Sequence, residues 1–255
     1  MKIGAQMYTI REFCKTPEDT IASLEKLAKI GYRYVQYSGC GPMDPALLKE
    51  NCDRLGIEII ITHSAYDRII NDTDALIREH DIMGCDYIGL GSMPKEAREN
   101  IEGLEKFLDV IKEPIQKIKA AGKRFGYHNH AFEFNEMEGK LLFDRLLERY
   151  GVDELGIILD SFWVCEGGVD IYQWIEKMNG RLYCVHLKDQ GERGDGKYSM
   201  MMPIGEGKLD FPSIIDAFEK AGAEYAFVEQ DICNGEDPFE CLRRSFEYLK
   251  SLGYC

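Results

Sequence analysis

The chain has 255 residues, 45% of them hydrophobic, and its 45 acidic and 31 basic side chains give a formal net charge of −14. This apolar content is enough for a large folded core and argues against a disordered chain. The negative balance argues against a nucleic-acid-binding protein and against binding to an anionic membrane, because both of these partners attract positively charged surfaces.

Short β-branched or aromatic runs alternate with longer amphipathic stretches along the whole chain. Eight runs are predicted to be strands: 2–8, 33–37, 58–63, 87–90, 124–130, 155–160, 182–187 and 225–230. Between them, apolar residues recur at helical spacing, for example at positions 104, 108, 111, 115 and 118. The first helix is predicted to start after Thr16, because Pro17 suits the first helical position and acidic residues follow it.

Glycines follow most of the predicted helices, where the left-handed conformation of a C-cap favours them. These glycines are Gly31, Gly56, Gly84, Gly122, Gly151 and Gly222. Eight alternating strand and helix units in about 250 residues predict an α/β protein with a closed (β/α)8 TIM barrel. An open doubly wound sheet is disfavoured, since no GxGxxG follows the first strand. No linker-like segment divides the chain, so residues 1–255 are predicted to form one domain.

The nine cysteines are scattered, and no two of them have the CxxC spacing of redox or zinc-ribbon motifs. An odd number of scattered cysteines fits a reducing compartment. The N-terminus lacks a signal-peptide core, and no apolar stretch approaches the roughly 20 residues of a membrane span. We therefore expect a cytoplasmic protein.

Four of the five histidines lie at the ends of predicted strands. His63 ends the third strand, His128 and His130 end the fifth, and His186 ends the seventh. Active sites of (β/α)8 barrels are built at the C-terminal ends of the strands, so these four are expected at one rim. His80 falls on a predicted helix, where we expect it to be exposed to solvent.

Carboxylates repeat this pattern. Asp160 ends the sixth strand, Glu229 lies at the end of the eighth, and Glu133 follows the fifth. An unpaired carboxylate is costly to bury, and a metal ion is one way to satisfy it. A salt bridge to Lys188 or Arg193, or a helix cap, is the alternative. One imidazole with three carboxylates is a ligand set that suits Mn²⁺, Mg²⁺, Co²⁺ or Zn²⁺.

A metal in such a site polarises a carbonyl and stabilises the enediolate that forms when a neighbouring C–H loses its proton. Proton transfer between adjacent carbons then gives isomerisation or epimerisation. Loss of a β-leaving group from the same enediolate gives elimination. These reactions share one kind of site, and the residue pattern leaves the choice between them open.

Five short motifs together resemble the sugar phosphate isomerase/epimerase family, the xylose isomerase-like TIM barrels, over essentially the whole chain. They are YHNHAFEF at 127–134, ILDSFW at 158–163, VHLKDQ at 185–190, PIGEGKLDF at 203–211 and FVEQD at 227–231. The resemblance implies one divalent metal ion at the barrel mouth, with Mn²⁺ as the first expectation and Mg²⁺, Co²⁺ or Zn²⁺ as alternatives.

The same resemblance implies that Asp160, His186 and Glu229 are metal ligands. Many family members have Glu at the end of the fifth strand, where this chain has His128. Glu133 is our expected fourth ligand and His128 the alternative. The HNHxxEF variant resembles the branch of inosose dehydratase-like proteins and lyases that act on 3-keto-glycosides.

In this branch His128 or His130 is expected to act as the general base, since imidazole titrates near neutral pH. Lys188 is expected either to neutralise an enolate oxygen or to pair with Glu229. The catalytic residues are thus expected among His128, His130, Glu133, Lys188 and Glu229. Substrate contacts are expected from His63, Trp163 and Glu206, the last within a Gly-Glu-Gly loop that also suits a turn.

The sequence therefore predicts a metal-dependent isomerase or epimerase acting on a small sugar, polyol or keto-glycoside through an enediolate. The alternatives are a lyase or dehydratase acting on a keto-sugar, inosose or 3-keto-glycoside by β-elimination, and a non-catalytic metal-binding or partner subunit. A family-IV apurinic endonuclease needs a trinuclear zinc cluster and more histidines than this chain has. No phosphate-binding loop is present. A homo-oligomer and a hetero-complex both stay open.

Overall fold

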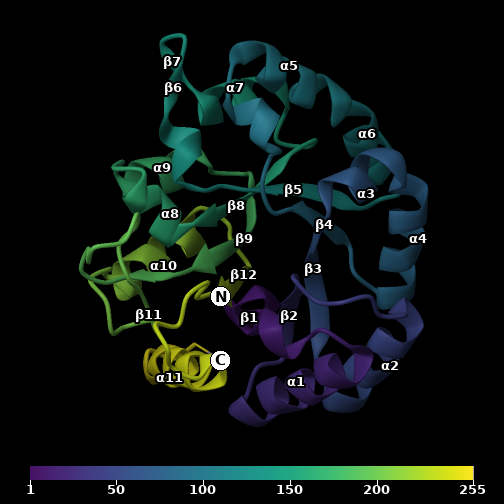
Figure 1. The fold of residues 1–255 in the computed structure, drawn as a ribbon, viewed down its shortest axis with the longest axis vertical. Helices are drawn as coiled ribbons and strands as arrows, with labels where there is room; N and C mark the ends of the chain where they lie inside the picture. Colours follow the sequence, from purple (N-terminus) through teal and green to yellow (C-terminus); the bar gives the residue numbers. More distant parts are fainter. Residues whose placement is uncertain (255) are drawn as a thin grey trace.

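The computed structural model describes residues 1–254, and at its centre eight parallel strands close into a barrel (Figure 1). Every predicted strand is present, with ends within two residues of the prediction. The barrel strands are β1 (Lys2–Gln6), β2 (Tyr34–Tyr37), β3 (Glu58–Ser64), β4 (Tyr87–Leu90), β5 (Arg124–His128), β8 (Gly156–Asp160), β9 (Leu182–Leu187) and β12 (Tyr225–Val228). They follow chain order around the barrel, and β12 pairs with β1 to close it. The predicted (β/α)8 fold is confirmed.

Helices surround the strands, as Figure 1 shows. The longer ones are α1 (Pro17–Ile30), α2 (Pro45–Leu55), α4 (Thr73–Met83), α5 (Ile101–Val110), α6 (Lys112–Ala120), α7 (Leu142–Arg149), α9 (Ile171–Lys177), α10 (Phe211–Lys220) and α11 (Pro238–Ser251). Short helices are η1 (Met7–Phe13), α3 (Tyr66–Asn71), η2 (Lys95–Arg98), η3 (Ala131–Phe134) and α8 (Ser161–Glu166). None of the helices in residues 1–254 is long and apolar enough to cross a membrane.

Two small antiparallel hairpins lie outside the barrel. One pairs β6 (Glu136–Met137) with β7 (Lys140–Leu141), and the other pairs β10 (Asp189–Gln190) with β11 (Met201–Met202). Both follow barrel strands at their C-terminal ends, where (β/α)8 barrels carry their longer loops.

Helix ends follow the chemistry of the chain. The Thr16 hydroxyl accepts a hydrogen bond from the Asp19 amide at 3.2 Å, which caps α1 as predicted. Gly56 and Gly84 adopt the left-handed conformation at the ends of α2 and α4. Gly151 does not, because α7 already ends at Arg149 with an extended cap at Tyr150.

The apolar series from position 104 to 118 forms two helices rather than one. The break between α5 and α6 lies at Ile111. Pro114 has no backbone N–H to donate to the Val110 carbonyl, so the chain cannot continue as one regular helix.

Apolar side chains pack in two places: between the helices and the outer face of the barrel, and inside the barrel itself. The inner cluster contains Ile61, Tyr87, Ile158, Cys184, Tyr225 and Phe227. His80 belongs to the outer packing. It is 1% exposed, and its imidazole contacts the Thr62 hydroxyl at 2.9 Å and the Leu76 carbonyl at 2.8 Å. Our expectation that His80 is exposed to solvent is wrong, because this face of α4 packs on β3.

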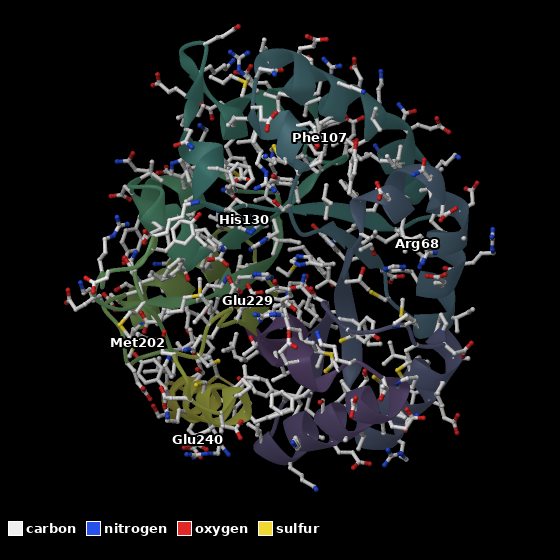
Figure 2. All side chains as sticks on the ribbon, in the orientation of Figure 1. Arg68, Phe107, His130, Met202, Glu229 and Glu240 are labelled. Carbon is white, nitrogen blue, oxygen red and sulfur yellow. The ribbon has the colours of Figure 1, made fainter. Side chains whose placement is uncertain are left out.

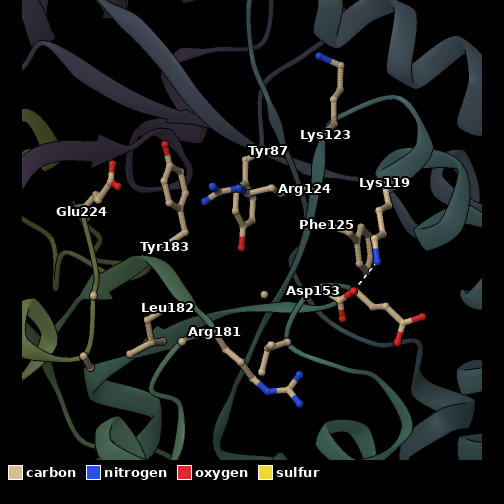
Figure 3. Close-up of a pocket in the computed structure, with 16 residues that line it drawn as sticks. Tyr87, Lys119, Lys123, Arg124, Phe125, Asp153, Arg181, Leu182, Tyr183 and Glu224 are labelled. Carbon is tan, nitrogen blue, oxygen red and sulfur yellow. Dashed lines mark hydrogen bonds and ion pairs between the residues drawn. The ribbon is translucent and has the colours of Figure 1, made fainter.

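A cavity of about 470 Å³ opens at the N-terminal end of the barrel (Figure 3). It is lined by residues such as Tyr87, Arg124, Arg181 and Tyr183, and includes none of the predicted site residues. Arg181 hydrogen-bonds four backbone carbonyls near the end of α7, which gives it a structural role. The predicted site therefore lies at the opposite end.

Candidate active site

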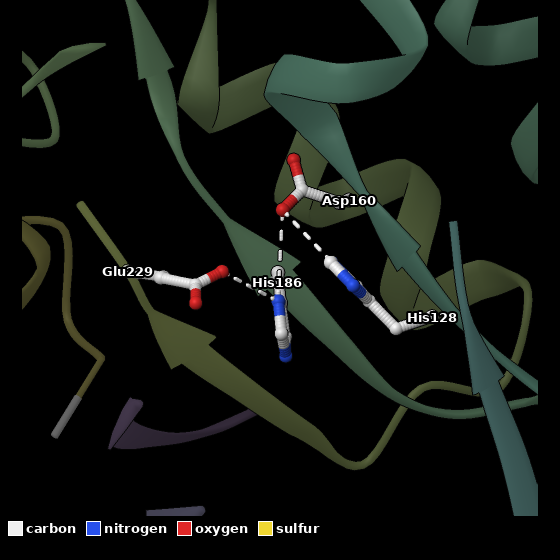
Figure 4. A group of neighbouring side chains, drawn as sticks. All are labelled: His128, Asp160, His186 and Glu229. Atoms are coloured by element: carbon white, nitrogen blue, oxygen red, sulfur yellow. Dashed lines mark hydrogen bonds and ion pairs between the residues drawn. The ribbon is translucent and has the colours of Figure 1, made fainter. Parts of the chain in front are cut away.

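Four buried side chains from four neighbouring strands meet at the C-terminal rim of the barrel (Figure 4). They are His128 from β5, Asp160 from β8, His186 from β9 and Glu229, which directly follows β12. Each offers one ligand atom, and these atoms all lie within 4.8 Å of one another. In Figure 2, Glu229 and His130 lie toward the middle of the molecule, whereas Glu240 lies at its lower edge.

Strand alternation explains this grouping. Side chains two residues apart on a strand point to the same face. Cys184 and Phe227 belong to the cluster inside the barrel, so His186 and Glu229 lie one layer above them on the same face. Asp160 pairs with His186 in the β8–β9 register. The sequence predicted these three neighbours correctly as residues at one rim.

Glu133 does not lie in this group. Its buried carboxylate accepts hydrogen bonds from the Tyr127 hydroxyl and from the His130 amide at 2.8 Å. Burial raises the pKa of this carboxyl to about 8, although both hydrogen bonds oppose the shift. We therefore correct our choice of fourth group member from Glu133 to the alternative, His128. Glu133 instead lies in the short η3 helix, five residues beyond the rim position, and its side chain caps the start of that helix at His130.

The two histidines of the group, His128 and His186, each bond an oxygen on the side remote from the carboxylates. His128 Nδ1 lies 3.0 Å from the Gly91 carbonyl, and His186 Nε2 lies 2.6 Å from Gln36 Oε1. An oxygen acceptor requires an N–H, so in the neutral ring the other nitrogen carries a lone pair. Those bare nitrogens face carboxylates: His128 Nε2 is 3.3 Å from Asp160.

His186 Nδ1 is 2.9 Å from Glu229 Oε2, and the same oxygen lies 2.9 Å from the Lys188 ammonium. Burial disfavours charge on the imidazole, but the carboxylates of Glu229 and Asp160 raise the pKa of His186. A lone pair facing two carboxylates is repulsive unless a proton or a cation lies between them. The donor set is therefore one that a divalent cation fits.

Lys188 lies beside the group and is fully buried. Its ammonium is 2.9 Å from Glu229, 3.2 Å from Asp160 and 3.1 Å from Asp231. Burial disfavours this charge, but the carboxylates around it raise the pKa of Lys188 above its ordinary value. Three carboxylates thus share one ammonium.

Asp231 was missed by our sequence reasoning. Burial raises its pKa to about 6, with Lys188 acting in the opposite direction. It follows Glu229 by two residues, and the same alternation that placed Glu229 was the signal available for it. Its position over Lys188 makes it part of the site.

The group opens into a pocket of about 590 Å³. Its lining includes the titratable residues His63, His128, His130, Lys188, Glu229 and Asp231. It also includes five residues that carry hydroxyls, namely Tyr8, Ser38, Ser64, Tyr66 and Ser92. Within residues 1–254, Lys188 is the one Lys or Arg in this lining. Such a pocket offers hydrogen bonds to an uncharged, oxygen-rich molecule.

His63 and His130 line the pocket, but Trp163 and Glu206 do not. Trp163 is 6% exposed and packs behind the His130 ring at 5.2 Å, which leaves it no free face for a sugar. Glu206 turns away and pairs with Arg244 at 2.9 Å. Our expected substrate contacts for these two residues are not provided by the geometry.

The loop around Glu206 has a structural task. Asp189, buried below it, accepts hydrogen bonds from the backbone amides of Gly205, Gly207 and Leu209. A Cβ added at Gly207 would lie 2.3 Å from the Asp189 carboxylate. The PIGEGKLDF motif therefore holds the chain against Asp189 instead of holding a ligand.

The sequence profile of the xylose isomerase-like TIM barrel family matches residues 24–252. The chain belongs to this family. The match spans nearly the whole barrel and confirms the resemblance that the five motifs indicated.

Two inosose dehydratases are among the relatives of the chain. That of Geobacillus thermodenitrificans (strain NG80-2) is 26% identical over 168 residues, which is 59% of this chain and 52% of that protein. That of Geobacillus kaustophilus (strain HTA426) is 24% identical over 217 residues, which is 75% of this chain and 67% of that protein. The matches thus cover about half to two thirds of the length of these curated relatives.

Solved structures share the fold. A sugar phosphate isomerase/epimerase from Parabacteroides distasonis ATCC 8503 superposes with a TM-score of 0.80 at 22% identity, over 98% of this chain and 97% of that one. The IolI protein, whose crystal structure holds a zinc atom, superposes with a TM-score of 0.73 at 15% identity, over 99% and 98% of the two chains. At these identities the likeness establishes the fold. Together with the dehydratase relatives, the family match supports a sugar-processing enzyme.

Proposed function

We propose that the chain is a divalent-metal-dependent enzyme that removes a proton next to the carbonyl of a small, uncharged keto-sugar or keto-polyol. The observation that carries the proposal is the convergence of His128 Nε2 and His186 Nδ1 on the carboxylates of Asp160 and Glu229, at 3.3 Å and 2.9 Å. Two imidazoles and two carboxylates that meet at one point form a ligand set for a divalent cation.

The proposed metal ligands are His128, Asp160, His186 and Glu229. When bound, a divalent cation supplies a Lewis acid that polarises the substrate carbonyl. Mn²⁺ is our first candidate, and two imidazoles with two carboxylates also suit Zn²⁺ and Co²⁺. The zinc atom in the IolI structure supports a metal in this fold. Gln36 and the Gly91 carbonyl would orient the two imidazoles.

His130 is the proposed general base. It lines the pocket, and burial, with His128 and Lys188 nearby, holds the pKa of His130 well below its ordinary value. The imidazole is therefore neutral at pH 7 and able to accept a proton. We no longer assign this role to His128, since its free nitrogen faces Asp160. Lys188 would place an ammonium beside the negative charge that develops on the substrate oxygen.

The lining supports a substrate without phosphate or carboxylate groups. Lys188 already contacts three carboxylates, and an anionic group would meet Glu229 and Asp231 in the same lining. The residues with hydroxyls in the lining suit a polyol. We place the protein in the cytoplasm on the basis of its scattered cysteines, which are unpaired in the described residues.

Two fates of the substrate follow from the same proton removal. Elimination of water is favoured by the two inosose dehydratase relatives, and isomerisation or epimerisation is the alternative. The test is incubation with an inosose and with a panel of ketoses in D₂O, after chelation and reloading with Mn²⁺. We expect activity that returns with the metal and deuterium that appears in the product or in recovered substrate.

Asp160→Asn is the matched variant for this test, since it keeps the shape of the side chain and removes its charge. We expect it to lose at least about a thousandfold in kcat, in line with removal of a group that acts in the transition state. Undiminished turnover after chelation would refute the metal requirement. Stoichiometric metal without turnover of any panel substrate would favour the non-catalytic subunit, and native mass spectrometry would then identify its partner.

A further inference from the structure

We propose that His63 is a neutral hydrogen-bond donor for one substrate oxygen, and that Gln6 acts as a positioning residue that places the proton on Nε2 of His63. The identity of the bound oxygen rests on the proposed function, whereas the position of the proton does not.

The orientation of the Gln6 amide is determined by the main chain. The backbone N–H of Tyr8 donates to Gln6 Oε1 at 3.0 Å. A backbone N–H cannot accept a hydrogen bond, so the amide oxygen must lie on this side. The NH₂ group therefore faces His63, where Gln6 Nε2 lies 3.3 Å from His63 Nδ1.

The orientation of Gln6 selects one tautomer of His63. Because the amide NH₂ only donates, Nδ1 must accept, and the single proton of a neutral imidazole then resides on Nε2. A ring whose Nδ1 accepts a hydrogen bond is neutral, and the rings of His128 and His186 pack beside it with centroids at 5.2 and 5.5 Å. His63 Nε2 is buried, lacks a partner within the described chain, and belongs to a side chain that lines the pocket.

The ring of His63 is also held in place. A Cβ added at Gly91 would lie 3.0 Å from His63 Nδ1, and one added at Gly89 would lie 3.1 Å from His63 Cδ2. The imidazole thus packs against the backbone of β4 at two points where a side chain would displace it. The Nε2–H of His63 is therefore a donor in a fixed position that makes no hydrogen bond within the described chain. A buried donor of this kind is typical of a ligand subsite.

The neighbouring pair of Gln36 and His186 in the same sheet has the opposite hydrogen-bond direction, because the imidazole donates and the amide accepts. Gln6 and Gln36 are register partners on β1 and β2. Gln36 Oε1 lies 2.6 Å from His186 Nε2 and accepts a hydrogen bond from it. Gln6 presents its NH₂ to His63, which leaves the proton on Nε2, the nitrogen without a partner in the described chain. The two amides thus direct one imidazole toward a cation and the other toward an oxygen lone pair, such as a carbonyl or hydroxyl of a polyol.

The test determines which ring nitrogen of His63 carries the proton. Histidine is labelled with ¹⁵N, and the protein is loaded with Zn²⁺, which is diamagnetic. At pH 7 we expect His63 to carry its proton on Nε2 and none on Nδ1. In Gln6→Glu the carboxylate can still accept from Tyr8 but cannot donate to Nδ1, so a proton is expected on Nδ1. A proton on Nδ1 in the wild-type protein, or the same protonation in both proteins, overturns the proposal.

Binding is tested in the same spectra with myo-inositol as the polyol probe. We expect the Nε2–H signal of His63 to shift as the pocket fills, and a titration that leaves it unmoved counts against the subsite. If an inosose is turned over, His63→Leu should lower kcat/KM about 3- to 10-fold, while His63→Gln, which keeps an NH₂ near the Nε2 position, should recover most of it. Equal loss in both variants with unchanged Tm would refute the donor role.

The two proposals fail separately. A protein with the expected tautomer that turns over no panel substrate contradicts the proposed function and leaves the donor in place. A protein that turns over inosose but carries the proton on Nδ1 contradicts the role of Gln6 and His63 alone.

Discussion

Replacing Lys188 with Met removes the ammonium from the middle of three carboxylates. In the folded protein the Lys188 side chain is 1% exposed, and Asp160 and Glu229 beside it are 0% and 4% exposed. Asp160 and Glu229 have little contact with solvent that could replace the ammonium. The variant is therefore expected to be much less stable when no metal ion is bound.

The size of the effect follows from this burial. Removing one partner of a buried ion pair costs about 3–5 kcal/mol, since it leaves the other charge uncompensated. For a chain of this length each kcal/mol shifts Tm by about 2–4 °C. We therefore expect Lys188→Met to lower Tm by about 6–20 °C in the presence of a chelator.

The assay is thermal unfolding followed by circular dichroism, with and without Mn²⁺. Lys220→Met is the matched control: Lys220 pairs with Asp216, but the two side chains are 74% and 59% exposed. Exposed pairs contribute about 0–1 kcal/mol, so this control should shift Tm by no more than about 4 °C. A ligand that binds only the folded state stabilises it, so Mn²⁺ should restore more stability to Lys188→Met than to the wild-type protein.

The pH dependence gives a second check. In the wild-type protein burial opposes ionisation, but Lys188 is the leading cause that holds the pKa of Asp160 and Glu229 below the ordinary range. Without it these pKa values rise above their unfolded values, so stability is present at low pH and lost as pH increases. The Tm deficit should be larger at pH 8 than at pH 5. A deficit below about 3 °C in chelator, equal at both pH values, would refute the reasoning.

Three further predictions concern neighbouring residues. Gln36→Met should weaken Mn²⁺ or Zn²⁺ binding about 10- to 100-fold, because His186 loses the acceptor that orients its ring. Competition with a chelator measures this affinity, and an unchanged affinity would contradict the orienting role of Gln36. The Glu133 carboxyl, with a pKa raised from 4.5 to about 8, contributes stability that is full below pH 4.5 and lost as pH rises through 8. Glu133→Gln should remove that loss in urea unfolding between pH 5 and 9 while metal affinity stays the same. Glu206→Gln should keep kcat/KM within about twofold, because Glu206 faces Arg244 outside the pocket, and a larger loss would return it to the site.

Local pattern along the chain was sufficient for the barrel and for part of its rim. Strand runs, helix caps such as Thr16 and the eightfold alternation are encoded by neighbours in sequence, which is why the strand ends were predicted to within two residues. Asp160, His186 and Glu229 were found because each interrupts or ends an apolar strand, and parallel strands bring their C-terminal ends to the same rim.

The choice between His128 and Glu133 was decided only in three dimensions. Both follow the same strand, and sequence distance does not show that the backbone turns into η3 and carries Glu133 to Tyr127. Trp163 and Glu206 were misplaced for the same reason, since the direction of a loop side chain depends on what packs against it. His80 was misjudged because one face of α4 rests on β3.

The positions of the imidazole protons of His63 and His186 depend on tertiary structure more than any other feature of the site. Nothing in the order of residues shows that Gln6 offers its NH₂ to His63 while Gln36 offers its oxygen to His186, because each pair joins strands that are distant in sequence. Residue types at strand ends determine which groups reach the rim. The closed barrel determines their separations and hydrogen-bond partners, and these decide which nitrogen can face a cation and which can face a substrate oxygen.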